Sequence, residues 1–118
     1  MLAKTLLEEG DEPFERIVDV AYADNCDLIV MGRGGSKLKR IFLGSTTARV
    51  IGYSPVDVLV IPFGKGLGWR RILVAVDGSS YSERAFEKAL KLANEHESEL
   101  IILSVVDYPP ETLPKPHR

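Results

Sequence analysis

The stretch that decides the fold spans residues 28–46 and reads LIVMGRGGSKLKRIFLGST. It opens with the continuous apolar run Leu28–Met31, which is typical of a strand covered on both faces. Glycines follow this run directly, and Gly44-Ser45-Thr46 then stands at the start of a short amphipathic stretch. The order of strand, glycine-rich loop and helix predicts one β-α unit of a parallel sheet.

The glycine-rich loop of this unit has the composition of an anion site. Glycines let backbone N–H groups converge on an anion, and a helix N-terminus adds a partial positive charge and unpaired donors. The segment 33–49 also carries basic residues and no acidic one, namely Arg33, Lys37, Lys39, Arg40 and Arg49. This arrangement suits phosphate. The alternative is that the glycines only turn the chain and the basic run is a solvated loop. The spacing matches neither a dinucleotide fingerprint nor a Walker loop.

The same pattern, an apolar run followed by an amphipathic stretch, recurs along the chain. The runs are mostly continuous and rich in Val and Ile, so they predict strands of a parallel sheet with both faces covered. Besides Leu28–Met31, the predicted strands are Val56–Ile61, Ile72–Val76 and Leu100–Val106, with a weaker candidate at Leu2–Leu7.

Three helices are predicted between these strands from their start and stop signals. The first has Asp11 as its N-cap and a proline in its first turn, and Asn25 closes it. The second is short, opening at Ser45 and ending near residues 52–55. The third and longest begins at Ser80, which has a glutamate three residues later in the spacing of a capping box.

Length and composition exclude several classes of protein. The 118 residues, 45% hydrophobic with a net charge of −2, fit one soluble domain. Cys26 is the only cysteine and the two histidines lie far apart, so neither a disulfide framework nor a metal site is expected. No apolar run approaches the roughly 20 residues of a membrane-spanning helix. We therefore expect a cytoplasmic protein without a membrane partner. Nucleic-acid binding is disfavoured, because the local basic patch lacks an aromatic platform.

A carboxylate follows the strand predicted over residues 72–76. The segment Val74–Ser80 reads VAVDGSS and places Asp77 at the carboxyl end of that strand. In a parallel sheet these ends face the ligand crevice, where a carboxylate can accept hydrogen bonds from a base amino group or a sugar hydroxyl. The alternative is that Asp77 only caps a helix or a turn.

Taken together, these residues resemble the universal stress protein family. In that family a first strand ends in Asp and a Ser-rich turn, and a motif Gly-x2-Gly-x9-Gly-[Ser/Thr] follows the fourth strand. Here Val74–Ser80 is similar to the first feature. The loop from Gly32 to Gly44-Ser45 is similar to the second, and it is one residue shorter than the family pattern.

The resemblance implies a fold and a strand order. The expected class is α/β: a five-stranded parallel sheet in a flavodoxin-like, adenine-nucleotide alpha-hydrolase-like doubly wound sandwich, permuted and lacking one helix. Residues 1–62 resemble the family's C-terminal half, 63–70 form a linker, 71–107 resemble its N-terminal half, and 108–118 form a Pro-rich tail. The family order 3-2-1-4-5 becomes 1-5-4-2-3 in the numbering of this chain's own strands. The halves together make one domain or one swapped domain.

The resemblance also implies a ligand. Family members that hold ATP or AMP, with or without Mg²⁺, contact the adenine or ribose through the Asp and the base through the end of a second strand, and they hold the phosphates on the glycine motif. Carried over position by position, the nucleotide-binding residues are Asp77, Val105, Gly32, Gly34, Gly35, Gly44, Ser45 and Thr46.

Two functions of different classes follow from this reading. The first is a nucleotide-binding regulatory or stress-response module, and the second is a ligand-free dimerisation or scaffold module of the same fold. Neither is an enzyme, and no catalytic residue is expected, because neither Ser79 nor Ser80 has an identifiable base. As partner we expect a second copy in a homodimer, either paired edge to edge through Val56–Val60 or domain-swapped.

Overall fold

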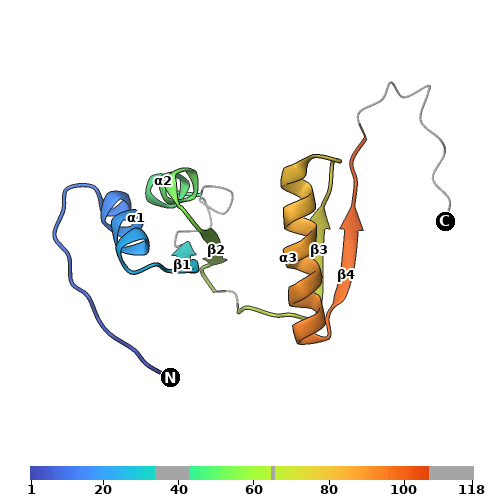
Figure 1. The fold of residues 1–118 in the computed structure, drawn as a ribbon, viewed down its shortest axis with the longest axis horizontal. Helices are drawn as coiled ribbons and strands as arrows, with labels where there is room; N and C mark the ends of the chain where they lie inside the picture. The colour runs from blue at the N-terminus through green and yellow to red at the C-terminus, as the bar shows by residue number, and fades with distance from the viewer. Residues whose placement is uncertain (34–42, 65, 107–118) are drawn as a thin grey trace. The chain divides into compact units, whose positions relative to one another are not determined.

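The chain forms two α/β units, each built on a pair of parallel strands (Figure 1). The computed structural model describes residues 1–33, 43–64 and 66–106. The first unit comprises Met1–Leu67 and the second Gly68–Arg118. The α/β class with parallel strands is therefore confirmed, whereas the expected tail at 108–118 lies outside the described residues.

The first unit packs two helices on one face of its sheet. Its elements are α1 (Pro13–Ala23), β1 (Leu28–Arg33), α2 (Ser45–Tyr53) and β2 (Asp57–Pro62). The two strands run parallel, from Leu28 opposite Asp57 to Arg33 opposite Pro62. The core consists of one buried side chain from each of α1, β1 and α2, namely Ala21, Ile29 and Val50. Because side chains alternate along a strand, the neighbours of Ile29 point away from this core.

The ends of α1 follow from local chemistry. Pro13 occupies the start of the helix, where its missing N–H costs nothing. The N-cap is Glu12, which makes no side-chain cap hydrogen bond, so the prediction of Asp11 as the cap was one residue early. Asn25 closes the helix as predicted. It adopts a left-handed conformation with φ of 51°, and the Cys26 N–H donates to the Ala21 carbonyl at 3.0 Å, as in a Schellman motif.

The second unit is a single β-α-β motif. It contains β3 (Arg71–Ala75), α3 (Ser80–His96) and β4 (Glu99–Leu103), with the strands parallel. The helix packs on one face of the strand pair and buries Val74, Ala89 and Ala93. At the amino end of β3, the Trp69 ring stacks on His96 with 4.2 Å between ring centroids. Backbone hydrogen bonds extend the ladder at both ends of β3, from Glu99 N–H to Arg70 O at 2.9 Å and from Val76 N–H to Leu103 O at 2.8 Å.

The start of α3 lies one residue from the predicted position. Ser79, rather than Ser80, is the N-cap, and its Oγ accepts a hydrogen bond from the Ser82 N–H at 3.2 Å. Ser82 returns the contact, because its Oγ donates to the Ser79 carbonyl at 3.0 Å. The shift arises because Asp77 holds the Ser79 N–H in a turn, which fixes Ser79 outside the helix.

The prediction of one five-stranded sheet is not confirmed. The described residues form two sheets of two strands each, β1 with β2 and β3 with β4. The segment Leu2–Leu7, the weaker candidate, has no strand conformation, and Leu2 and Leu7 are almost fully exposed. A strand forms only where an edge offers partners for its backbone groups. Each pair that did form is joined by its own β-α-β connection, so its two strands meet at little entropic cost.

Candidate functional site

The carboxyl ends of β1 and β2 form a candidate site in the first unit. A pocket of about 510 Å³ opens there, lined by Val30, Met31, Gly32, Arg33, Ile61, Pro62 and Phe63. The predicted site residue Gly32 belongs to this lining, and a Cβ built on it would meet no atom within 4 Å. The backbone at Gly32 can therefore be approached closely by a ligand group.

Gly44 and the first turn of α2 offer backbone donors to an anion. Gly44 is the N-cap and takes φ of 92° and ψ of 147°, a conformation that only glycine adopts readily. Its carbonyl accepts the N–H of Ala48 at 3.0 Å and closes the first turn. The N–H groups of Ser45 and Thr46 lie in that turn, where the helix itself supplies no carbonyl to accept them. The predicted Gly34 and Gly35 lie outside the described residues.

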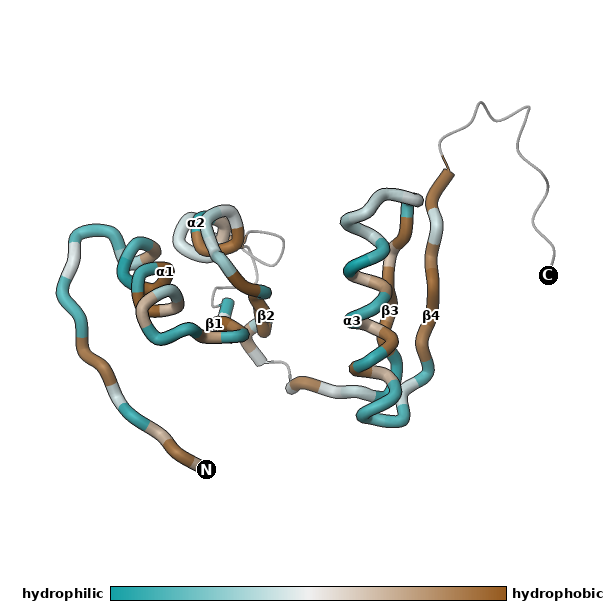
Figure 2. Tube along the Cα trace, viewed as in Figure 1, coloured by the Kyte–Doolittle hydropathy of each residue, from teal (hydrophilic) through white to brown (hydrophobic). Residues whose placement is uncertain are grey.

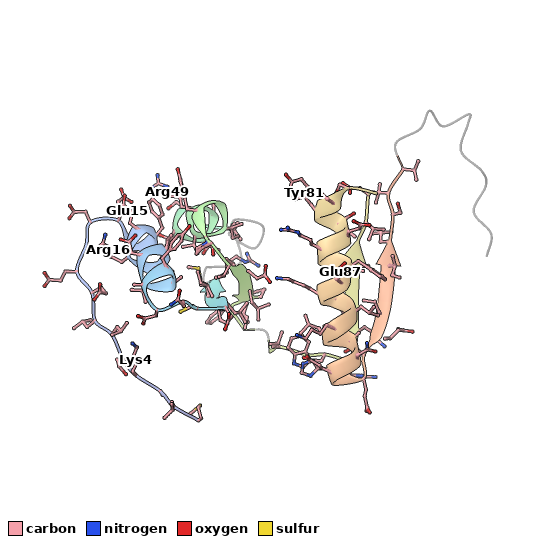
Figure 3. All side chains as sticks on the ribbon, viewed as in Figure 1. Lys4, Glu15, Arg16, Arg49, Tyr81 and Glu87 are labelled. Carbon is pink, nitrogen blue, oxygen red and sulfur yellow. The ribbon has the colours of Figure 1, made fainter. Side chains whose placement is uncertain are left out.

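Arg49, one of the basic residues in the glycine-loop segment, has a structural role. Its guanidinium donates to Glu12 at 3.0 Å and stands 5.3 Å from the centre of the Phe14 ring. The side chain thus joins α2 to the start of α1 (Figure 3). Arg33 also has a partner in the structure. Lys37, Lys39 and Arg40 lie outside the described residues, so the structure assigns no phosphate contact to the basic run.

The second unit has a candidate site of its own at the carboxyl ends of β3 and β4. A pocket of about 370 Å³ is lined there by Ala75, Val76, Asp77, Ser79, Tyr81, Ser82, Leu103 and Val105. Asp77 and Val105, which are 28 positions apart in the sequence, line the same pocket. The structure therefore brings these two predicted site residues together within one unit.

A compact turn holds Asp77 at the mouth of this pocket. Its Oδ1 accepts a hydrogen bond from the Ser79 N–H at 2.9 Å, and its own N–H donates to Ser82 Oγ at 3.3 Å. Gly78 between them takes φ of 83°, which permits the tight bend. Asp77 thus stabilises the turn, which is the structural role considered above, and its carboxylate also lines the pocket.

The hydrogen bonds of this turn stabilise the charged form of Asp77. The Ser79 side chain contributes most, followed by the Ser79 N–H and the Ser82 side chain, and together they lower the pKa of Asp77 below its ordinary value of 3.8. The carboxylate is therefore ionised throughout the neutral range. It acts as a hydrogen-bond acceptor and not as a proton donor.

This lowered pKa predicts a titration that can be measured. A depressed pKa in the folded state means that ionised Asp77 adds stability above pH 3.8, and that this stability is lost as the pH falls through the lowered value. Carbon-detected NMR of the Asp77 carboxyl should give a midpoint below 3.8, and Ser79→Ala should move it upward. A midpoint at or above 3.8 in the unmodified chain would contradict the turn described here.

Tyr81 and Ser82 line this pocket and were not singled out from the sequence. Tyr81 is 84% exposed and projects from the first turn of α3 (Figure 3), while Ser82 links Asp77 to the helix cap. The spacing of Ser79 and Ser82 is a signal that could have revealed the second residue, because the N-cap and the third helical residue are reciprocal partners. For Tyr81 the sequence holds no comparable signal.

Among the residues that the structure describes, no group of three or more His, Cys, Asp or Glu side chains could hold a metal ion. No helix in the same part of the chain is long and apolar enough to cross a membrane.

The fold is of the α/β class with parallel strands and has pockets at the strand ends, and comparison with known proteins specifies the family. The profile of the Universal stress protein family matches residues 2–62 and 68–116. These segments include nearly all of both units, and the chain belongs to the universal stress protein family. Membership supports a role in the stress response.

Two curated relatives show the same similarity over part of the chain. A universal stress protein of Methanothermobacter thermautotrophicus is 36% identical over 58 residues, which is 49% of this chain and 39% of the relative. Universal stress protein Sll1654 of Synechocystis is 50% identical over 60 residues, which is 50% of this chain and 38% of the relative. Each alignment thus covers well under half of the relative's length. No solved structure matches the chain.

Proposed function

We propose that the chain is an adenine-nucleotide-binding module of the universal stress protein family, with a regulatory or stress-response role. The observation that carries the proposal is the pocket in which Asp77 and Val105 meet at the carboxyl ends of β3 and β4. The sequence analysis assigned both residues to the same ligand from separate parts of the chain, and both line this one pocket. The pocket lies at the carboxyl ends of the strands, where α/β sheets bind ligands.

The polar groups of this pocket suit the nucleoside part of ATP or AMP. The ionised Asp77 carboxylate can accept hydrogen bonds from the adenine amino group or a ribose hydroxyl, and the backbone at Val105 can pair with the base edge. Leu103 and Ala75 add apolar surface on which a ring can lie. Tyr81 supplies an exposed aromatic ring beside the opening.

The first unit suits the phosphates. Gly32 leaves the backbone open to close approach, and Gly44 points no side chain toward the start of α2. The N–H groups of Ser45 and Thr46 can donate to phosphate oxygens, aided by the helix dipole. A Mg²⁺ ion that accompanied ATP would be held chiefly by the phosphates and water. No catalytic step is proposed for this site.

The direct test is a calorimetric titration of ATP and AMP into the full chain at neutral pH. We expect saturable binding near one nucleotide per chain, and mass spectrometry of gently released small molecules should find co-purified adenine nucleotide. No heat of binding, together with no thermal shift at millimolar ATP, would contradict the proposal. That result would favour the ligand-free scaffold, to which the exposed apolar strands of both units also point.

A further inference from the structure

Tyr81 is the one aromatic side chain among the described residues that line the pocket of the second unit. It is 84% exposed, so the chain covers only a small part of its surface. A single exposed aromatic residue is common on a protein surface and calls for no explanation by itself. Here, however, the other lining residues are aliphatic residues, serines and one aspartate. Tyr81 therefore gives this pocket its only flat aromatic surface within the described residues.

The start of α3 determines where the Tyr81 ring lies. Tyr81 is the second residue of α3 and follows the turn that joins β3 to the helix. In an α-helix each Cα–Cβ bond tilts toward the N-terminus, so a side chain in the first turn leans toward the strand ends. Reciprocal hydrogen bonds between Ser79 and Ser82, of 3.2 and 3.0 Å, hold this turn. The backbone thus presents Tyr81 at the pocket from the helix side (Figure 3).

The strand ends supply further apolar surface to the same pocket. Leu103 is the last residue of β4, and Val105 follows the strand with 79% of its surface exposed. Figure 2 shows β4 and the residues after it as hydrophobic along most of their length. Tyr81 comes from the helix whereas Leu103 and Val105 come from the end of a strand, so two separate elements contribute apolar surface. Surfaces of this kind suit a flat ring of a ligand.

Asp77 adds a polar requirement to this flat apolar surface. Its Oδ1 accepts the Ser79 N–H at 2.9 Å, and an ionised carboxylate has about four lone-pair sites, so it can accept further hydrogen bonds. Because the ionised group accepts only, it favours an amino group of the ligand and repels a carbonyl oxygen. The acceptor and the aromatic ring together suit a planar heterocycle that carries an exocyclic amino group.

We infer that Tyr81 determines base specificity: its ring stacks on the base that Asp77 binds and favours purines over pyrimidines. This inference rests on the proposed function for the presence of a nucleotide, and it adds the residue that selects the base. Stacking strengthens with the overlap of the two rings, and a purine has two fused rings where a pyrimidine has one. Loss of such an aromatic partner weakens the binding of a base by roughly 5- to 150-fold.

The test compares ATP with CTP, which share the ribose, the triphosphate and an exocyclic amino group but differ in the ring system. Calorimetric titration of each nucleotide into the full chain gives two Kd values, and their ratio depends on the base alone. We expect Tyr81→Ala to weaken ATP binding by about tenfold or more and CTP binding by less, so the preference for ATP falls. Tyr81→Phe keeps the ring and should preserve both Kd values, and Tyr81→Trp should bind ATP at least as tightly as the unmodified chain.

Tyr22→Ala is the matched control for the loss of an exposed tyrosine. Tyr22 lies on α1, is 65% exposed and lines neither of the two pockets described above. Its truncation should leave both Kd values unchanged. Urea denaturation of Tyr81→Ala completes the control, because alanine is favourable in a helix and the free energy of unfolding should not fall.

The outcomes separate this inference from the proposed function. If the unmodified chain binds ATP and Tyr81→Ala binds it with the same Kd, the role of Tyr81 is overturned and the proposed function stands. Equal losses of ATP and CTP affinity in Tyr81→Ala also overturn it, since a merely structural residue would affect both nucleotides alike. If the unmodified chain binds neither nucleotide, the proposed function fails and the specificity role fails with it.

Discussion

Val50→Ala is expected to lower the free energy of unfolding of the first unit by about 2–3 kcal/mol, because two buried methyl groups are lost and a cavity is left. Val50 is 0% exposed, and no other described side chain is as fully buried. It lies on α2 and contacts the cluster that joins α1 to β1 through Ala21 and Ile29. The buried cluster has only three side chains, and the hydrophobic residues packed against it are only partly buried, so they fill the cavity incompletely.

Urea denaturation followed by far-ultraviolet circular dichroism measures this loss. Ile51→Ala is the matched control, since Ile51 follows Val50 in the same helix but is 46% exposed. Its truncation should cost less than about 1 kcal/mol. Equal effects of the two substitutions would show that the cluster around Val50 does not hold the unit together.

ATP titrated into the Gly32→Val chain is expected to give no heat of binding, while the fold stays intact. Gly32 lies within β1, where a β-branched residue is favoured, and a Cβ at this position meets nothing within 4 Å. The added side chain occupies the mouth of the pocket that Gly32 lines, in the space that we assign to a phosphate. The loss is therefore steric and local to the ligand.

Gly32→Val is a sharper test than any substitution of Gly44. With φ of 92°, Gly44 holds a conformation that strains any other residue, so a change there costs about 1–3 kcal/mol and disturbs the start of α2. Gly52→Ala, at the far end of α2, is the control and should bind ATP normally. If the Gly32→Val chain binds ATP as tightly as the unmodified chain does, the assignment of the phosphate site to the carboxyl end of β1 is wrong.

Much of the candidate site could be predicted from local sequence. Gly44 is at the start of α2 and Asp77 follows β3, as predicted, whereas β4 ends at Leu103, three residues before the predicted end, so Val105 lies after the strand and not within it. Their positions depend on turn and cap chemistry that acts over a few neighbouring residues. The contribution of Ser82 was missed because the cap shifted from Ser80 to Ser79. That shift depends on one hydrogen bond from Ser79 to Asp77, which a sequence pattern does not weigh.

The sequence by itself determined the helices, the four paired strands and the parallel class, because capping residues, apolar periodicity and branched side chains act locally. Only the tertiary structure decided that Leu2–Leu7 forms no strand, that the strands divide into two sheets, and that Asp77 and Val105 line one pocket. The physical reason is that a β-strand is stable only when neighbouring strands accept and donate its backbone hydrogen bonds. Backbone groups must find partners across an edge, and which edge is within reach depends on the length of the connection.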